Sequence, residues 1–479
     1  MCSLNDRVQR VCEEVLQRIT PSREEKINTL RFVNSLIEKL RCKLEKLGLE
    51  AEVCVEGSIA KDTWIAGEKD IDLFMLVPKE YGKEAFQKVL EAAKDVCKGR
   101  FLEAYAEHPY IHAEMEGFTI DFVPCFKLER AEEAISSVDR TPFHTTYVKK
   151  HLKPEGRREV RLLKRFMRGI GTYGAEIKIG GFSGYLCELL VMYYGSFLNV
   201  LKAASNWHGR ILIDIENHYR GRIEEALKIF DQPLIVIDPV DKNRNVASAV
   251  SRERLAEFIA ASRLFIKNPS VRFFFPPELK PFSMQEAIER MRSKGTSFVF
   301  LKTEAVKAVP DVLWGQLYKS QRALKRLILR YDFEVLRDAV WSDEKTSTVF
   351  IFELKSHTLP AAKKHIGPPI AKKMDCERFL KKHLSSKMLV SGPRIEGDRW
   401  VVEKKRRYRN ASILLKDFLK DGGRSVGVAS LVSEAFSSSL EVIVNEEIMD
   451  FYLSNEDFAS FFTRYLIGKP MWLNEEAGF

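Results

Sequence analysis

The sequence lacks the features that mark several protein classes. None of its eight cysteines belongs to a C-x-x-C pair, and their scattered positions argue against a disulfide framework or a zinc site. The N-terminal segment carries charges and no apolar run, so we expect no secretory signal. The most apolar stretch, Tyr185 to Leu201, contains Glu188 and is short for a membrane span. We therefore expect a cytoplasmic chain with reduced thiols and no membrane segment.

Low-complexity tracts and clear internal repeats are also absent. The 479 residues exceed one ordinary core, and a hydrophobic fraction of 45% with a charged fraction of 30% is typical of globular proteins. The formal net charge of +10 favours a polyanionic partner, because Lys and Arg displace counterions condensed around phosphates. Charge excess alone is weak support for nucleic-acid binding, so motifs have to decide.

Periodicity predicts a mixed α/β unit followed by helices and at least one α+β module. Ser22 and Glu25 form a capping-box pattern before a long amphipathic helix that ends at Gly48. Apolar alternation predicts the elements that follow, with strands at 51–55, 71–77 and 118–123 and a helix at 85–96. Helical periodicity runs from 157 to 205. Beyond Pro277, strand-like segments at 298–302 and 349–354 flank a helix at 313–330.

Gly57 and Ser58 directly follow the first predicted strand. A glycine lets the backbone come close to a phosphate, and a serine hydroxyl can donate to phosphate oxygens. A lone Gly-Ser is usually an ordinary loop. In this position, however, the pair is a candidate phosphate-binding turn.

Three aspartates lie on the strands that come next. Asp70 and Asp72 are two residues apart and so share one face of a strand, and Asp121 lies among apolar neighbours in a later strand. Carboxylates suit Mg²⁺, and two-metal sites hold ions about 3.5 to 4 Å apart. A lone D-x-D is usually a solvated turn, but Gly-Ser, D-x-D and a later strand Asp in this order predict a metal-dependent nucleotidyltransferase.

These residues resemble the DNA polymerase β-like nucleotidyltransferases, whose motif is a Gly-Ser turn, [DE]-x-[DE] and a third carboxylate. Further segments resemble one family within them, the class I (archaeal-type) CCA-adding enzymes, or tRNA nucleotidyltransferases. The segments are 57–64, 106–110, 138–144, 160–164, 173–176, 181–190, 238–241 and 244–246. The resemblance is specific from about residue 50 to 250 and becomes a general layout beyond.

The resemblance implies template-independent addition of C, C and A to the 3′ end of tRNA from CTP and ATP, with Mg²⁺ as cofactor and pyrophosphate as product. By matching positions, it implies catalytic metal ligands at Asp70, Asp72 and Asp121, and nucleotide contacts at Gly57, Ser58, Lys61, Thr141, His144, Lys164, Tyr173 and Arg244, the last at the base. Lys61 and Asp70 replace the Arg and Glu of some members. A lysine cannot grip phosphate in a bidentate manner, so this departure affects the expected nucleotide affinity.

The fold that the resemblance implies is an α+β multidomain chain. It has a polymerase β-like nucleotidyltransferase head at 1–150, a helical neck for base selection at 151–265, a body at 266–302 and 398–479, and a tail at 303–397. The resemblance also implies that body and tail hold the acceptor and TΨC arms of tRNA. The basic run 404–409 suits backbone recognition of an RNA duplex, although a charge run is more often a solvated face. Whether the chain forms a homodimer stays open.

Two alternatives remain at this stage. The same three carboxylates would serve a poly(A) or oligoadenylate polymerase, which differs in substrate and in the length of its product. The second alternative is a non-catalytic RNA-binding protein of the same fold, which the basic charge supports.

Overall fold

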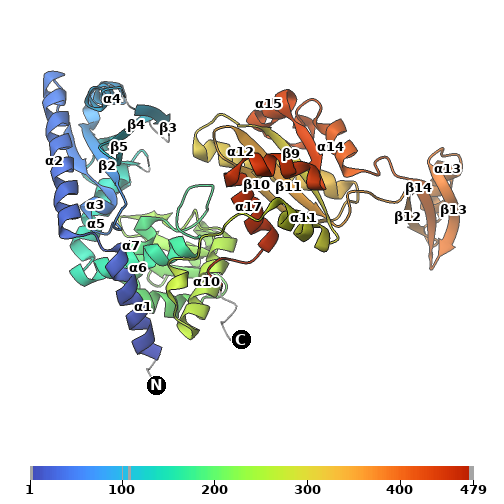
Figure 1. Cartoon of the computed structure of the whole chain (residues 1–479), viewed down its shortest axis with the longest axis horizontal. Helices are drawn as coiled ribbons and strands as arrows, with labels where there is room; N and C mark the ends of the chain where they lie inside the picture. The colour runs from blue at the N-terminus through green and yellow to red at the C-terminus, as the bar shows by residue number, and fades with distance from the viewer. Residues whose placement is uncertain (1–3, 100, 106–108, 137, 474–479) are drawn as a thin grey trace. The chain divides into compact units, whose positions relative to one another are not determined.

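The computed structural model describes residues 4–99, 101–105, 109–136 and 138–473 (Figure 1). These residues form two compact units. Unit 1 contains the described residues up to Glu278 and those from Pro470 onward, and unit 2 spans Leu279–Lys469. The predicted α+β multidomain class is confirmed, since both units combine helices with sheets.

The first part of unit 1 is a five-stranded sheet with the order β1-β2-β5-β4-β3. Strands β2 and β5 are parallel, and the other neighbours are antiparallel. Ile71 and Leu73 are buried with α2 and α4, so the intervening Asp72 projects from the opposite face of the sheet. The elements are α2 (Arg23–Lys46), β1 (Glu52–Val55), α3 (Gly57–Ala60), β2 (Asp70–Pro78), α4 (Glu84–Cys97), β3 (Phe101–Tyr105), β4 (Pro109–Met115) and β5 (Phe118–Lys127).

Helix α2 confirms the long helix that the sequence predicts. The Ser22 hydroxyl accepts from the Glu25 amide at 3.0 Å, as a helix cap should. The Glu25 carboxylate turns away and accepts from the Gly67 amide at 2.8 Å, so the cap is not reciprocal. The face of α2 that packs on the sheet includes Leu36, whereas Leu30 is half exposed. The buried face is therefore rotated slightly from the one that the apolar periodicity predicts.

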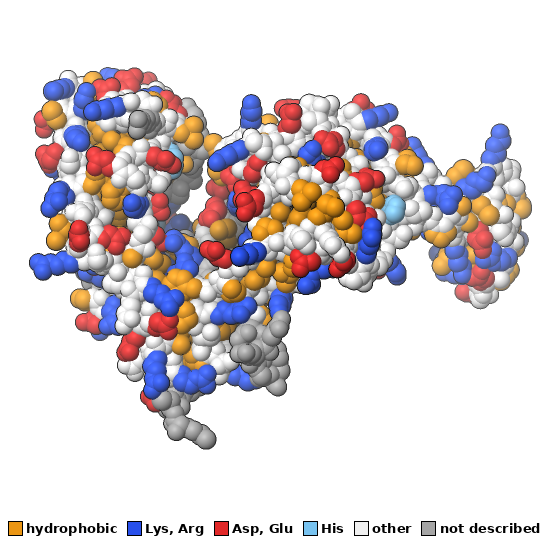
Figure 2. All heavy atoms as spheres, in the orientation of Figure 1, with side chains coloured by type: hydrophobic (Ala, Val, Ile, Leu, Met, Phe, Trp, Pro, Cys, Tyr) orange, Lys and Arg blue, Asp and Glu red, His pale blue; other side chains and the backbone are white. Residues whose placement is uncertain are grey.

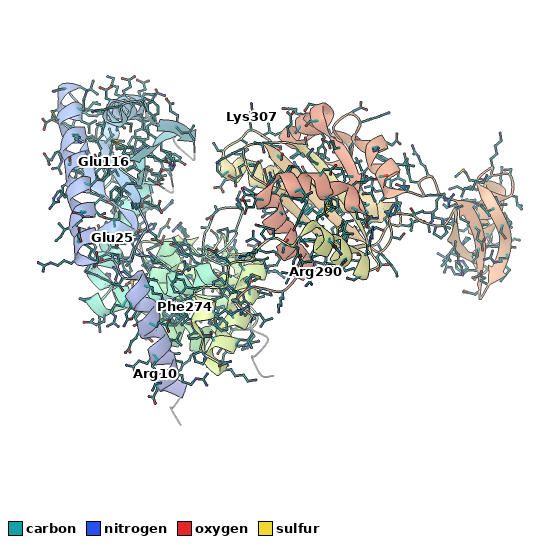
Figure 3. The ribbon with its side chains drawn as sticks, in the orientation of Figure 1. Arg10, Glu25, Glu116, Phe274, Arg290 and Lys307 are labelled. Carbon is teal, nitrogen blue, oxygen red and sulfur yellow. The ribbon has the colours of Figure 1, made fainter. Side chains whose placement is uncertain are left out.

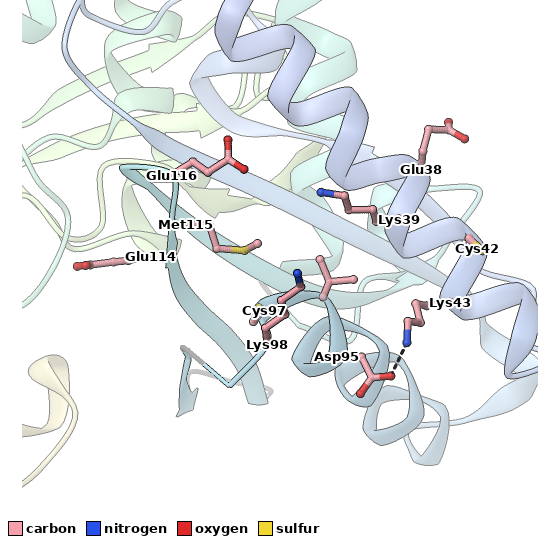
Figure 4. Close-up of a pocket in the computed structure, with 11 residues that line it drawn as sticks. Glu38, Lys39, Cys42, Lys43, Asp95, Cys97, Lys98, Glu114, Met115 and Glu116 are labelled. Atoms are coloured by element: carbon pink, nitrogen blue, oxygen red, sulfur yellow. Dashed lines mark hydrogen bonds and ion pairs between the residues drawn. The ribbon is translucent and has the colours of Figure 1, made fainter.

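A cavity of about 860 Å³ opens on the side of the sheet that α2 and α4 cover (Figure 4). Lysines and acids line it together, and the Lys43 ammonium pairs with the Asp95 carboxylate at 2.8 Å across its edge. Because Asp72 faces the other side of the sheet, this cavity is separate from the aspartates that the sequence singles out.

The remainder of unit 1 is helical around an aromatic core. The Phe166 ring lies 5.5 Å from the rings of both Phe265 and Phe274, the latter labelled in Figure 3. Helix α1 packs against α6 and contributes apolar residues to this core. The helices are α1 (Leu4–Ile19), α5 (Thr141–His151), α6 (Pro154–Gly169), α7 (Gly184–Tyr194), α8 (Phe197–Ala204), α9 (Ile223–Ile229) and α10 (Arg252–Lys267).

A three-stranded sheet lies within this helical part, in the order β6-β7-β8. Its strands are β6 (Ile211–Asp214), β7 (Leu234–Asp238) and β8 (Asp241–Asn245). Every residue of β7 is buried, including the terminal Asp238. The tight connection to β8 therefore places a buried carboxylate next to Arg244.

The apolar stretch around residue 190 folds into α7 and α8, which meet at a 91° bend. No single described helix is long and apolar enough to cross a membrane, and this bent pair passes such a test by length and composition only. Both helices contribute buried residues to the aromatic core.

Unit 2 contains a four-stranded sheet with the order β10-β11-β9-β15 and helices on both faces. Along β9, Val299 and Leu301 pack toward one helical layer, while Phe298 and Phe300 pack toward the other. The coverage of both faces explains the continuous apolar run at 298–301, because a strand buried on both faces has no polar side. The strands are β9 (Ser297–Glu304), β10 (Val335–Ser342), β11 (Ser347–Leu354) and β15 (Glu441–Val444).

The helices of unit 2 are α11 (Met284–Ser293), α12 (Pro310–Arg330), α13 (Lys373–Leu384), α14 (Ala411–Leu419), α15 (Ser430–Ser439), α16 (Met449–Ser454) and α17 (Glu456–Ile467). Helix α13 packs on a separate three-stranded sheet of order β12-β14-β13, formed by β12 (Ala362–Pro369), β13 (Leu389–Glu396) and β14 (Arg399–Lys405). Strand β9 spans the expected body–tail boundary at residue 302, and β10 and β11 share its sheet. The domain boundaries expected from the sequence stay predictions.

Candidate active site

Asp72 and Asp121 stand side by side on the parallel strands β2 and β5. They are direct partners in the register, and Asp70 is opposite Thr119 at the exposed start of β2. Burial, the Asp121 carboxylate and, more weakly, Asp70 raise the pKa of Asp72 to about 6, against the opposing effect of Lys61. Burial also raises the pKa of Asp121. The site thus concentrates negative charge that the protein compensates only in part.

Gly57 lies directly against the Asp72 carboxylate. Its φ is +65°, and a Cβ at this position would stand 1.9 Å from Asp72 Oδ2. The Glu56 amide also donates to the Asp72 carbonyl at 2.9 Å. A glycine is required here by the left-handed backbone and by this close approach. The sequence argument invoked an approach to phosphate, and the structure shows an approach to the carboxylate as well.

Two polar side chains beside the aspartates were missed by the sequence reasoning. His112 of β4 lies opposite Asp121, and its Nδ1 is 2.6 Å from Asp121 Oδ1. Glu56 is buried, and its Oε2 atom has no hydrogen-bond partner among the described residues. Ser58 follows Gly57 in α3 and is partly buried. The Glu56 carboxylate therefore adds a further oxygen atom, beside Asp72, that can bind a cation.

Lys61 and Lys164 meet at a fully buried carboxylate, Glu188 of α7. The Lys61 ammonium lies 2.6 Å from Glu188 Oε2, and the Lys164 ammonium lies 3.6 Å from Oε1. The Thr63 hydroxyl donates to Oε1 at 2.6 Å. Burial opposes ionisation of Glu188, yet the two lysines hold its pKa below the usual value. Burial lowers the pKa of Lys164, and Glu188 counteracts that shift.

Tyr173 joins the lysines at the start of α7. A Cβ added to Gly184 would stand 3.0 Å from the Tyr173 hydroxyl and 3.5 Å from Lys164 Nζ, so both side chains meet over this glycine. Arg168 covers the Tyr173 ring, with 4.7 Å from its Cζ to the ring centroid. Burial raises the pKa of Tyr173, which keeps its hydroxyl protonated and able to donate.

His144 and Arg244 meet at a second fully buried carboxylate, Asp238. Oδ2 of Asp238 lies 2.7 Å from Arg244 Nη1 and 2.9 Å from His144 Nε2. Oδ1 accepts from the Tyr185 hydroxyl at 3.2 Å and from the Val240 amide at 3.1 Å. Burial opposes ionisation of Asp238, but His144 and Arg244 hold its pKa below the usual value. Burial lowers the pKa of His144 despite the carboxylate beside it.

Tyr185 connects the two carboxylate clusters. Its ring stacks on His144 with centroids 4.2 Å apart, and the Lys61 ammonium lies 5.7 Å from the Tyr185 centroid. The clusters around Glu188 and Asp238 therefore form one continuous arrangement of residues from the end of α3, from α5, α6 and α7, and from β7 and β8.

The structure places all the predicted site residues in unit 1. The aspartates share one face of the sheet. Buried acids bring Lys61 together with Lys164, and His144 together with Arg244. Thr141 is the first residue of α5. The sequence reasoning missed Glu188 and Asp238. Their signal was an acid within an apolar helix or strand, because a buried charge needs a partner.

A pair of carboxylates on neighbouring parallel strands beside a Gly-Ser turn defines the class of this protein as a nucleotidyltransferase. The family model described as "Nucleotidyltransferase domain" matches residues 37–144. Two further models match, "tRNA nucleotidyltransferase, second domain" at 158–275 and "CCA-adding enzyme, C-terminal domain" at 294–445. Nucleotidyltransferase domains use divalent metal ions in general.

Curated relatives give the family. The chain is 39% identical to the CCA-adding enzyme of Methanosarcina acetivorans, covering 94% of this chain and 97% of that protein. It is 36% identical to the CCA-adding enzyme of Methanothermobacter thermautotrophicus, over 92% of this chain and 97% of that protein. The chain belongs to the CCA-adding enzyme family.

Among solved structures, the chain is similar to the RNA terminal uridylyl transferase Cid1. The sequences are 17% identical, the TM-score is 0.44, and the match covers 57% of this chain and 98% of that one.

Proposed function

We propose that this nucleotidyltransferase adds C, C and A to the 3′ end of tRNA, using CTP and ATP and no nucleic-acid template. The observation that carries the proposal is the pairing of Asp72 with Asp121 next to Gly57, in a chain whose family is that of CCA-adding enzymes. Each addition joins the 3′ hydroxyl of tRNA to the α-phosphate of a nucleotide and releases pyrophosphate.

The aspartates fit Mg²⁺ by their chemistry. No three His, Cys, Asp or Glu side chains in the described parts of the chain are arranged as a ready metal cage. Mg²⁺ needs no such cage, since it keeps several waters and uses one or two carboxylates with substrate phosphates. Asp72 and Asp121 offer adjacent carboxylates whose pKa values are raised first by burial and then by the neighbouring acids, and Asp70 is the third proposed ligand. Bound Mg²⁺ would supply positive charge for the attacking hydroxyl and the leaving pyrophosphate.

The cations of unit 1 suit the two ends of a nucleotide. Lys61 and Lys164 share one carboxylate, which leaves a net positive charge for a triphosphate, together with Ser58 and Tyr173. Arg244 gives Nη1 to Asp238, and its side chain is 33% exposed, so its other N–H groups can donate to a base. Base choice then depends on protein side chains, as a reaction without a template requires.

A basic pocket in unit 2 supports binding of the acceptor and TΨC arms of tRNA. The cavity has a volume of about 490 Å³, and Figure 2 shows Lys and Arg side chains around the region of β12–β14. Seven of its lining residues are Lys or Arg, and they are Arg330, Lys363, Lys382, Lys404, Lys405, Arg406 and Arg407. Asp332 is the acid among the lining residues. Such a surface suits an RNA phosphate backbone.

The test is incubation with tRNA that lacks its 3′ end and with each nucleoside triphosphate, singly and in mixtures. We expect CTP alone to add two residues, and CTP with ATP to add C, C and A and then stop. An extended A tail would establish the poly(A)-type alternative instead. Binding of tRNA without any incorporation would establish the non-catalytic alternative. Cytoplasmic location and a homodimer stay predictions that fractionation and light scattering would check.

A further inference from the structure

Four of the predicted nucleotide contacts are held by two carboxylates that are themselves completely buried. Glu188 holds Lys61 and Lys164, and Asp238 holds His144 and Arg244. Both acids are 0% exposed and their oxygens accept from protein donors, so neither is a direct ligand of a nucleotide or a metal ion. Each acts on a ligand only through the side chains that it orients.

We infer that Glu188 and Asp238 are positioning residues that divide the nucleotide site between them, Glu188 arranging the cations for the triphosphate and Asp238 arranging Arg244 for the base. This inference rests on the proposed function. It assigns separate and measurable consequences to two residues that lie in one continuous cluster.

The contacts of Glu188 explain its half of the division. Two lysine ammonium groups buried together would repel each other, and burial already lowers the pKa of Lys164. Glu188 receives Lys61 at one oxygen, while the other oxygen receives the Thr63 hydroxyl and lies near Lys164. The carboxylate therefore counteracts the lowered pKa of Lys164 and fixes the positions of both ammonium groups, which a triphosphate needs and a base does not.

The contacts of Asp238 explain the other half. Its two oxygens accept from four donors, so no lone pair is left for a ligand. This carboxylate fixes the Nη1 group of Arg244, and the other N–H groups of the partly exposed guanidinium can donate to a base edge. An asparagine would present an N–H₂ group to these donors and release Arg244 from its orientation. Base discrimination requires that orientation, whereas phosphate binding does not.

The experiment compares Glu188→Gln with Asp238→Asn in the full chain, after circular dichroism has shown that each variant folds. Two quantities are measured on tRNA that lacks its 3′ end. The first is discrimination, the ratio of kcat/KM for CTP to that for UTP. The second is inhibition by inorganic triphosphate, which reports the phosphate half of the site because it has no base.

For Glu188→Gln we expect inhibition by inorganic triphosphate to weaken about tenfold or more, with discrimination changed less than about twofold. For Asp238→Asn we expect discrimination to fall about tenfold or more, with unchanged inhibition. Asp241→Asn is the matched control. Asp241 is also a buried acid, but its carboxylate accepts from Arg140 Nε at 2.9 Å and from the Asn243 amide at 3.1 Å and not from the four nucleotide residues. It should change neither quantity.

Equal losses of both quantities in the two variants would overturn the inference, because a merely structural role predicts them. If either variant fails to fold, milder changes replace it. Thr63→Val removes one donor to Glu188, and Tyr185→Phe removes one donor to Asp238, and each should show the same split more weakly. A wild-type chain that adds no C, C and A would instead reject the proposed function, and inorganic triphosphate binding by calorimetry would still test the Glu188 half.

Discussion

Unit 1 contains two kinds of carboxylate that differ in burial and in their partners, the fully buried Glu188 and Asp238 and the partly exposed Asp72 and Asp121. Glu188 and Asp238 each contact cationic side chains and have lowered pKa values. Asp72 and Asp121 form no ion pair with Lys or Arg among the described residues, and their pKa values are raised. The same chemical group is thus a scaffold where the protein supplies the cation and, in the proposed function, a ligand site where the cation comes from outside. Four predictions test this contrast.

The largest effect should come from removing a ligand carboxylate. Asp72→Ala or Asp121→Ala should lower nucleotide incorporation at least about a thousandfold, because the remaining carboxylates cannot hold the metal ions for transfer. Binding of tRNA should be almost unchanged, since neither aspartate contributes positive charge to a phosphate. Incorporation assays and filter binding measure the two quantities.

Asp95→Ala is the control for that loss, because Asp95 is an exposed acid of helix α4 that pairs with Lys43. It should leave incorporation within about twofold of the wild type. Undiminished incorporation in both Asp72→Ala and Asp121→Ala would reject the site.

Removing a scaffold carboxylate should affect stability instead. Glu188→Ala leaves Lys61 and Lys164 buried without their shared partner, and the free energy of unfolding should fall by about 3 to 5 kcal/mol. Asp72→Ala should not lower it, because that carboxylate is repelled by its neighbours. Urea denaturation of both variants measures the difference. Similar losses in the two variants would remove the distinction between scaffold and ligand site.

The pH dependence of stability should separate the two kinds of carboxylate further. Because the pKa of Asp72 is raised to about 6, the folded state binds its proton more tightly than the unfolded state. The contribution of protonated Asp72 to the free energy of unfolding is complete below about pH 4 and is lost as the pH rises through about 6. Relative to the wild type without metal, Asp72→Asn should therefore gain about 1 to 2 kcal/mol over that range, after allowance for solvent screening.

Addition of MgCl₂ should stabilise the wild type more at pH 8 than at pH 5, because deprotonated Asp72 binds the cation. Thermal unfolding of wild type and Asp72→Asn at both pH values checks this. An equal shift with MgCl₂ in both proteins would place the metal elsewhere.

Local patterns were sufficient to predict the strand that carries Asp70 and Asp72. Asp70 and Asp72 were expected on one face of a strand from their spacing, and β2 begins at Asp70. The register that sets Asp72 beside Asp121 was not accessible, because it depends on which strands pair, and β2 pairs in parallel with a strand that follows two intervening ones. Alternation along one strand predicts which side chains share a face of the sheet, but it does not predict which strand lies beside it.

The scaffold carboxylates were harder to predict for the same reason. Glu188 was noted only as an argument against a membrane span, yet its partner Lys61 is 127 positions earlier in the chain. Asp238 ends an apolar strand, and its partner His144 is 94 positions earlier. A sequence indicates that such acids need partners, while the fold decides which cations reach them.

The smallest effect should appear where the charge balance is reversed, in the basic pocket of unit 2. Burial and the neighbouring Lys363 and Lys382 lower the pKa of Lys404, so an RNA phosphate that binds beside this lysine would stabilise its charge. Lys404→Ala should weaken tRNA binding severalfold and reduce the slope of log Kd against log salt concentration by about 1. Lys302→Ala should change neither, since Lys302 is already paired with Glu441 at 2.7 Å. Equal effects of both substitutions would mean that total charge, and not the pocket, attracts the RNA.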